Sequence, residues 1–237
     1  IKNELGVYLY NISTPLEAQI NKELLEITTE YPETTKTITD INHIPISSRC
    51  YGLFQGVHWV VNMILSTNTY FDEIAQKTIH ISDNKLGSVD GYMLAGFPFA
   101  IKSTKDQKKI REHIHDAFIG MKCINELTKY VPNFIYTFGI YKKGDTYNVI
   151  NEYVQGETLH EYIQNKDTFN FEEFLFIIIQ ISLAIQVAQN RCGFVHWDLT
   201  PWNIILQRTT EVQQFDYVLS HDKTFRIKTQ VIPVIID

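Results

Sequence analysis

The chain has 237 residues and a formal net charge of −6, and 44% of its residues are hydrophobic while 20% are charged. This composition is typical of a globular protein and excludes an intrinsically disordered chain. An acidic balance without a basic stripe also argues against nucleic acid as the main partner. The first elements, over 1–78, are predicted to be largely helical, because apolar residues recur at helical spacing after Pro15 and again around Trp59.

Short segments of strand type follow from Ile79 to Tyr153. They are separated by Asn, Asp, Gly and Pro, which terminate strands and form turns. A single long helix over 105–129 interrupts them, since apolar residues recur there every three or four positions. The order predicts a small antiparallel sheet lobe over 79–153, with strands at 79–81, 91–94, 99–102, 134–141 and 147–153.

The remainder of the chain, 154–237, is predicted to be a mostly helical lobe. We expect a short helix at 159–163 and a long apolar helix at 171–190. Polar residues interrupt the apolar run of 174–188, which we interpret as a buried core helix, too short and too polar to span a membrane. A loop, a hairpin over about 210–230 and a last strand follow, so the fold class is α+β.

The loop His196-Trp197-Asp198-Leu199-Thr200-Pro201-Trp202-Asn203 carries the clearest chemical pattern. An Asp can accept a proton from an attacking hydroxyl, and an Asn five residues later can hold a metal that neutralises phosphate charge. The chain ends in an apolar strand followed by Asp237, where such a site places its second metal ligand. We therefore expect the sequence to end within its own site and to be inactive by itself.

This loop and the order of the elements resemble the protein-kinase-like fold over 79–237, which implies a bilobal structure with an extra helical segment at its N-terminus. The resemblance implies that Asp198 is the catalytic residue that orients the acceptor hydroxyl and takes its proton. It further implies Asn203 and Asp237 as metal ligands, a bracing role for His196, and ATP with Mg²⁺ as cofactors.

Lys102, in Ala-Ile-Lys, resembles the Lys on the third strand of the family, which pairs with the inner phosphates of the nucleotide. The residues alone also allow a solvated Lys on a strand. In the family a helix carboxylate holds this Lys. Asp116 suits the register best, and Glu112 and Glu126 compete with it.

Two further segments resemble parts of a nucleotide site. Leu86-Gly-Ser-Val-Asp-Gly91 is similar to a reduced form of the Gly-rich loop that covers phosphates, with Gly87 and Gly91 just before strand two, although such spacing also occurs in ordinary turns. The segment 151–156 resembles the hinge, which implies that the Glu152 carbonyl and the backbone of Val154 read adenine.

Three functions remain open. The first is a protein Ser/Thr kinase that transfers the ATP γ-phosphate to a hydroxyl. The second is a small-molecule kinase of the aminoglycoside or choline type, favoured by Thr200 where protein kinases commonly have Lys. The third is a non-catalytic pseudokinase. The expected partners are ATP and either a protein or a small alcohol, with no membrane, and the three scattered cysteines predict a reducing, cytoplasmic location.

Overall fold

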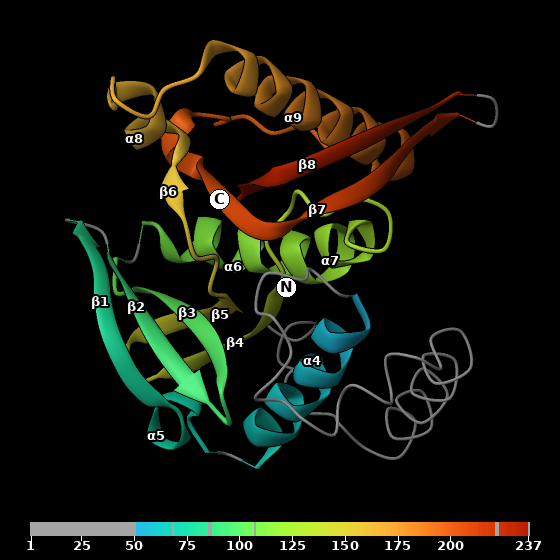
Figure 1. The fold of residues 1–237 in the computed structure, drawn as a ribbon. Coiled ribbons are helices and arrows are strands. Elements are labelled where there is room, and N and C mark those ends of the chain that lie inside the picture. The colour runs from blue at the N-terminus through green and yellow to red at the C-terminus, as the bar shows by residue number, and fades with distance from the viewer. Residues whose placement is uncertain (1–50, 68, 85–86, 107, 221–222, 237) are drawn as a thin grey trace. The chain divides into compact units, whose positions relative to one another are not determined.

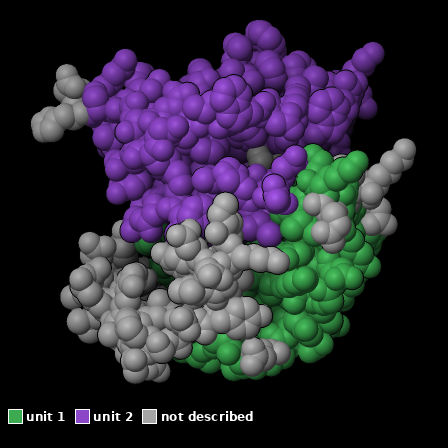
Figure 2. Space-filling view, turned by 180° about the vertical axis from the view of Figure 1, so that it is seen from behind, with its two compact units in different colours: residues 1–110, 138–150 green, residues 111–137, 151–237 purple. Residues whose placement is uncertain are grey.

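The computed structural model describes residues 51–67, 69–84, 87–106, 108–220 and 223–236. The helix predicted after Pro15 lies outside these residues. The chain divides into two compact units, which are coloured in Figure 2. Unit 1 comprises the described residues up to Ile110 together with 138–150, and unit 2 comprises the described residues of 111–137 and 151–237. Each unit is described by itself below.

Five strands form one sheet in the order β1-β2-β3-β5-β4 (Figure 1). β1 pairs antiparallel with β2, and β2 pairs antiparallel with β3. All five predicted strands are present, each extending or shifting by a few residues. They are β1 (Gln76–Asn84), β2 (Gly87–Leu94), β3 (Phe97–Thr104), β4 (Thr137–Lys143) and β5 (Thr146–Glu152).

An aromatic core holds unit 1 together. Phe54 lies on helix α4 (Tyr51–Ser66) and makes an edge-on contact with Phe138 of β4. Phe71, which begins the short helix α5 (Phe71–Ile74), contacts Phe99 of β3 at 4.9 Å between ring centroids. Edge-on aromatic pairs of this kind add stabilisation beyond their buried area. In this region Phe54 and Phe71 are therefore part of a packed core, whereas Trp59 and Met63 are exposed.

The long helix predicted over 105–129 is divided into three parts: α6 (Ile110–Ile119), the π-helical turn η2 (Gly120–Ile124) and α7 (Asn125–Leu127). A buried side chain explains why the chain departs from a regular helix here. Asn125 accepts from the backbone N–H of Thr137 (2.9 Å) and donates to its carbonyl (2.7 Å). A Cβ on Gly120 would lie 2.5 Å from the Thr137 hydroxyl, so this close approach requires glycine.

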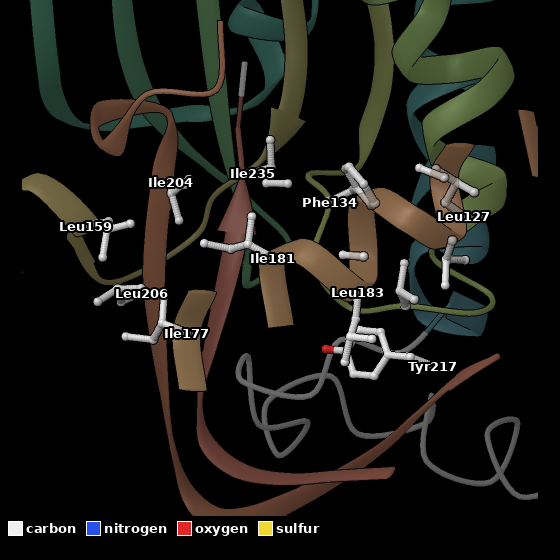
Figure 3. Packing of buried hydrophobic residues seen from close by; sticks show 14 of the residues in the cluster. Leu127, Phe134, Leu159, Ile177, Ile181, Leu183, Ile204, Leu206, Tyr217 and Ile235 are labelled. Atoms are coloured by element: carbon white, nitrogen blue, oxygen red, sulfur yellow. The ribbon is translucent and has the colours of Figure 1, made fainter. Parts of the chain in front are cut away.

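Unit 2 is built around one long helix and a long hairpin. Helix α9 (Phe171–Cys192) packs against β7 (Ile204–Ser220) and β8 (Lys223–Ile235), which pair antiparallel, and the two-residue strand β6 (Glu157–Thr158) extends the sheet (Figure 1). The predicted hairpin is thus confirmed and is longer than expected. Figure 3 shows side chains of these elements meeting in the core, among them Ile177, Ile181, Ile204, Leu206, Tyr217 and Ile235.

Helix α9 buries one face, which includes Ile177, Ile181 and Ala184, so the interpretation as a core helix holds for that face. Leu175, Phe176 and Ile179 of the same helix are exposed. Helix α9 is also the one helix among the described residues that is long and apolar enough to cross a membrane by length and composition, with a mean hydropathy of 1.8. The expectation that this run is too short and too polar for a span is therefore wrong, because the helix continues for 22 residues.

Candidate functional site

The loop with the predicted Asp and Asn begins where α9 ends. Gly193 adopts a left-handed conformation (φ 65°), and its N–H donates to the carbonyl of Gln189 at 3.0 Å. Glycine adopts this conformation without steric cost, so it ends the helix and redirects the chain. The loop closes in a 3₁₀ turn, η3 (Pro201–Asn203), from which β7 starts.

Asp198 and Asn203, both predicted site residues, are brought together by this loop. The Nδ2 atom of Asn203 donates to the Asp198 carbonyl at 2.9 Å and to the carboxylate atom Oδ2 at 3.3 Å. The backbone adds two further bonds, from Thr200 N–H to the Asp198 carbonyl (2.9 Å) and from Asn203 N–H to the Thr200 carbonyl (3.0 Å). The loop therefore fixes the carboxylate while leaving Asp198 exposed.

The loop is attached to the core at both of its ends. The Asp198 N–H donates to Nδ1 of His196 (3.3 Å), and the His196 ring packs edge-on against Phe194, which in turn contacts the buried ring of Phe134. At the other end, the N–H of Ile236 donates to the Asn203 carbonyl at 3.0 Å. Asp237, the predicted second metal ligand, lies outside the described residues.

An aromatic pair that the sequence reasoning missed lies beside the loop. The indole of Trp202 stacks on the imidazole of His160, with 4.3 Å between ring centroids and an interplanar angle of 20°. His160 lies in the first turn of helix α8 (Leu159–Gln164), which a capping box between Thr158 and Glu161 begins. The Thr-x-x-Glu spacing of this capping box agrees with the start of the short helix that the sequence predicts at 159–163.

The predicted phosphate-covering segment is a strand and not a loop. Gly87 pairs with Thr104 of β3 and Gly91 with Ala100, and both also pair with β1. The expectation of a loop over 86–91 is therefore wrong for 87–91, because cross-strand pairing extends through all of these residues; Leu86 lies outside the described residues. A Cβ on Gly87 would meet the Ser103 carbonyl oxygen, so close backbone packing explains this glycine.

Lys102 lies on β3 opposite Val89 of β2 and is partly buried. Asp116 lies on α6 with 60% of its side chain exposed, and its carboxylate is 3.8 Å from Nδ1 of His115. Lys102 belongs to unit 1 and Asp116 to unit 2, so their pairing stays a prediction.

Asp90, the residue before Gly91 on β2, is part of a cluster of charged side chains that the sequence reasoning missed. Its carboxylate contacts Lys77 Nζ (2.8 Å) and His80 Nδ1 (2.7 Å) on β1. Burial opposes ionisation of this group, but the two partners outweigh burial and lower the pKa of Asp90 below its usual value. The cluster ties β1 to β2 next to the two glycines.

Two residues of the predicted hinge, Glu152 and Val154, are buried. Glu152 is the last residue of β5, and its N–H donates to the Tyr136 carbonyl at 2.9 Å. Val154 packs with Ile232 and Val234 of β8. Asn151 has a buried side-chain oxygen without a hydrogen-bond partner among the described residues. An amide at this position remains without a structural explanation.

Hard oxygen donors suit Mg²⁺, and this loop offers them. Because Nδ2 of Asn203 donates to Asp198, the amide oxygen Oδ1 is the atom that remains for a cation. The described residues contain no group of three or more His, Cys, Asp or Glu side chains that could hold a metal ion. The amide oxygen of Asn203 and the carboxylate oxygens of Asp198 are donors of the kind that Mg²⁺ prefers.

Comparisons with known proteins agree on one family. A model of the protein kinase domain matches residues 86–231. Uncharacterized protein 179R of Invertebrate iridescent virus 6 is 41% identical over 167 residues, which cover 65% of this chain and 14% of that protein. Probable kinase 098L of Invertebrate iridescent virus 3 is 31% identical over 141 residues, which cover 60% of this chain and 26% of that protein. The chain thus spans about a quarter or less of the length of these relatives.

Solved structures support the same fold. A kinase-domain crystal structure superposes with a TM-score of 0.53 at 21% identity, covering 70% of this chain and 50% of that chain. The structure of Rad53 residues 1–466 with AMP-PNP gives a TM-score of 0.51 at 17% identity, covering 78% and 44%. The predicted mixed α+β kinase fold is confirmed at this level. Because the family model matches more than half of the chain, this protein belongs to the protein kinase family.

Proposed function

We propose that this chain is part of an ATP- and Mg²⁺-dependent phosphotransferase that transfers the γ-phosphate to a Ser or Thr hydroxyl of a protein. Family membership supports phosphoryl transfer. A Ser or Thr acceptor is supported by a relative from Clostridium perfringens that is named a probable serine/threonine-protein kinase. This relative is 29% identical over 119 residues. The observation that carries the proposal is the bonding of Asn203 to both the carbonyl and the carboxylate of Asp198.

Asp198 is the residue to which we assign proton acceptance. Its carboxylate is exposed and oriented by Asn203, so an acceptor hydroxyl can approach it and donate a proton as the phosphoryl group transfers. Phosphoryl transfer depends mostly on positioning and charge neutralisation, and Asn203 serves positioning by binding both the backbone carbonyl and one carboxylate oxygen of Asp198.

The nucleotide contacts are assigned residue by residue. In unit 1, Lys102 is assigned to the inner phosphates, and Gly87, at the start of β2, to close backbone approach. Gly91 is the weaker candidate, since it lies inside a strand, where a Cβ would come within 2.8 Å of the Ile79 side chain. In unit 2, the Glu152 carbonyl and the backbone N–H and carbonyl of Val154 are assigned to adenine, and Asp116 is assigned to orienting Lys102.

Asn203 Oδ1 and Asp237 are proposed to hold the metal. The hydrogen bond from Ile236 to the Asn203 carbonyl supports this assignment, because it places the residue before Asp237 beside Asn203. When bound, Mg²⁺ supplies positive charge that neutralises the transferring phosphate. Asp198 keeps its separate role at the acceptor hydroxyl.

The test uses the full-length natural protein with γ-³²P-labelled ATP and Mg²⁺. Casein serves as a protein acceptor, and kanamycin and choline serve as small alcohols. Phosphate on Ser or Thr of casein, and none on the small alcohols, is the expected result. Transfer to kanamycin or choline would support a small-molecule kinase instead. ATP binding without transfer to any acceptor or to water would indicate a binding module and contradict the proposal.

A further inference from the structure

The catalytic loop carries an indole that the proposed reaction does not yet use. Trp202 lies between Asp198 and Asn203 of that loop in sequence, within the η3 turn, and 57% of it is exposed. An exposed indole offers a large, flat aromatic surface on which a second aromatic ring can stack. Its ring contact with His160 covers only part of that surface.

The position of this indole is fixed by structure on both sides of the stack. Thr158, two residues before His160, pairs with Ile205, three residues after Trp202, through the β6–β7 ladder. Thr158 also begins α8, since its hydroxyl accepts from the Glu161 N–H at 3.1 Å. Strand pairing and the helix cap therefore hold His160 and Trp202 together, and the indole is pre-organised beside the loop.

Three carboxylates, on β6, α8 and α9, are already engaged within the fold. Arg208 already pairs with both Glu173 (3.0 Å) and Glu157 (3.5 Å), and Glu161 accepts the capping bonds of Thr158. These carboxylates are committed to partners within the fold. The near-parallel stack on His160 instead extends naturally to a third planar ring, because offset stacking is a preferred geometry for aromatic groups.

We propose that Trp202, stacked on His160, is a specificity-determining residue that binds an aromatic side chain of the acceptor protein close to the hydroxyl that is phosphorylated. This inference rests on the proposed function, since it takes Asp198 of the same loop as the group that meets the hydroxyl. Pre-organisation of the indole means that little side-chain entropy is lost when the acceptor binds. The preference is therefore expressed mainly in KM.

The experiment measures phosphorylation of synthetic peptides by the full-length protein. Each peptide has one Ser in an Ala-rich background, and a single Phe is moved through the positions on either side of it. A further peptide carries Lys in place of Phe. We expect Phe at one or two positions to raise kcat/KM about two- to tenfold over the peptide without Phe, mainly through a lower KM. The ratio of kcat/KM with Phe to kcat/KM without Phe should fall to about one in Trp202→Ala. Trp202→Phe should retain most of the preference for Phe.

Trp197→Ala is the matched control, because Trp197 is an indole of the same loop with 92% exposure and should leave the ratio unchanged. Fluorescence anisotropy of the labelled peptides measures peptide binding independently of phosphate transfer. Loss of the Phe preference in binding would therefore contradict the role of Trp202, whereas peptide binding without phosphate transfer would contradict the proposed kinase function. Equal kcat/KM for peptides with and without Phe, or a preference for Lys, would overturn the inference. So would a Phe preference that survives in Trp202→Ala.

Discussion

Asn203 holds Asp198 at two points, since its Nδ2 atom lies 2.9 Å from the Asp198 carbonyl oxygen and 3.3 Å from the carboxylate atom Oδ2. The two residues are five positions apart, and the η3 turn between them ends at Asn203, directly before β7. One side chain thus shapes the backbone of the loop and orients its carboxylate. This arrangement explains why the loop needs an amide at position 203 in addition to any role in metal binding.

A buried hydrogen-bond chain behind the loop provides a test of stability. The hydroxyl of Tyr217 donates to Oδ1 of Asn133 (2.8 Å), whose Nδ2 donates to the Pro233 carbonyl (2.9 Å). Tyr217→Phe would leave Oδ1 of Asn133 buried without this donor. The free energy of unfolding should therefore fall by about 1–3 kcal/mol in urea titrations. Tyr130→Phe is the control and should change it by less than about 0.5 kcal/mol, because Tyr130 is exposed.

The pH dependence of stability should show the ion pair between Glu173 and Arg208. The guanidinium donates to both carboxylate oxygens, at 3.0 and 3.2 Å, and lowers the pKa of Glu173 below its usual 4.5 despite partial burial. A carboxylate whose pKa is lower in the folded state than in the unfolded state stabilises the fold at pH values above its unfolded-state pKa. This stabilisation is lost as the pH falls through the folded-state pKa.

We therefore expect Glu173→Gln to destabilise the protein by at most about 1 kcal/mol at pH 7, since the pair is partly exposed. The difference from the wild type should shrink as the pH falls below 4.5. Urea titrations at several pH values measure it, and Glu172→Gln is the neighbouring control. A difference that stays constant down to pH 3 would show that the ion pair is not its source.

Thiol reactivity should distinguish two cysteines. Burial, together with the neighbouring Cys192 thiol, raises the pKa of Cys123 to about 12. Cys192 is exposed at the end of α9. In a Cys50→Ser background, iodoacetamide at pH 8 should alkylate Cys192 at least roughly a hundredfold faster than Cys123, because the thiolate is the reactive form. Mass spectrometry follows both sites, and equal rates would contradict the assignment.

The sequence predicted the strands and the hairpin because their apolar residues and turn residues form local patterns. It missed the π-helical turn at Gly120–Ile124, since apolar positions continue through it at nearly helical spacing. What imposes the turn is the contact of Asn125 with Thr137, a pairing that periodicity does not encode. The sequence also placed the predicted phosphate-covering segment in a loop. Glycine occurs both in turns and in strands whose backbones pack closely, so its presence alone does not distinguish the two.

Within the candidate site, the local part was predictable and the long-range part was not. Asp198 and Asn203 come from one short motif, so their spacing sufficed to pair them. The stack of Trp202 on His160 joins residues 42 positions apart, and it depends on the β6–β7 pairing. Tyr217 and Asn133 are 84 positions apart, and no local pattern connects them.

The most direct test of the account replaces Asp198 with Asn in the full-length natural protein, with Asp167→Asn as the matched control on an exposed turn. Phosphate transfer from labelled ATP and nucleotide affinity are measured on the same samples. We predict that Asp198→Asn lowers kcat by about 10²- to 10⁴-fold, because the proton acceptor is lost, while the Kd for ATP stays within about twofold. Transfer at the wild-type rate in Asp198→Asn would contradict the account.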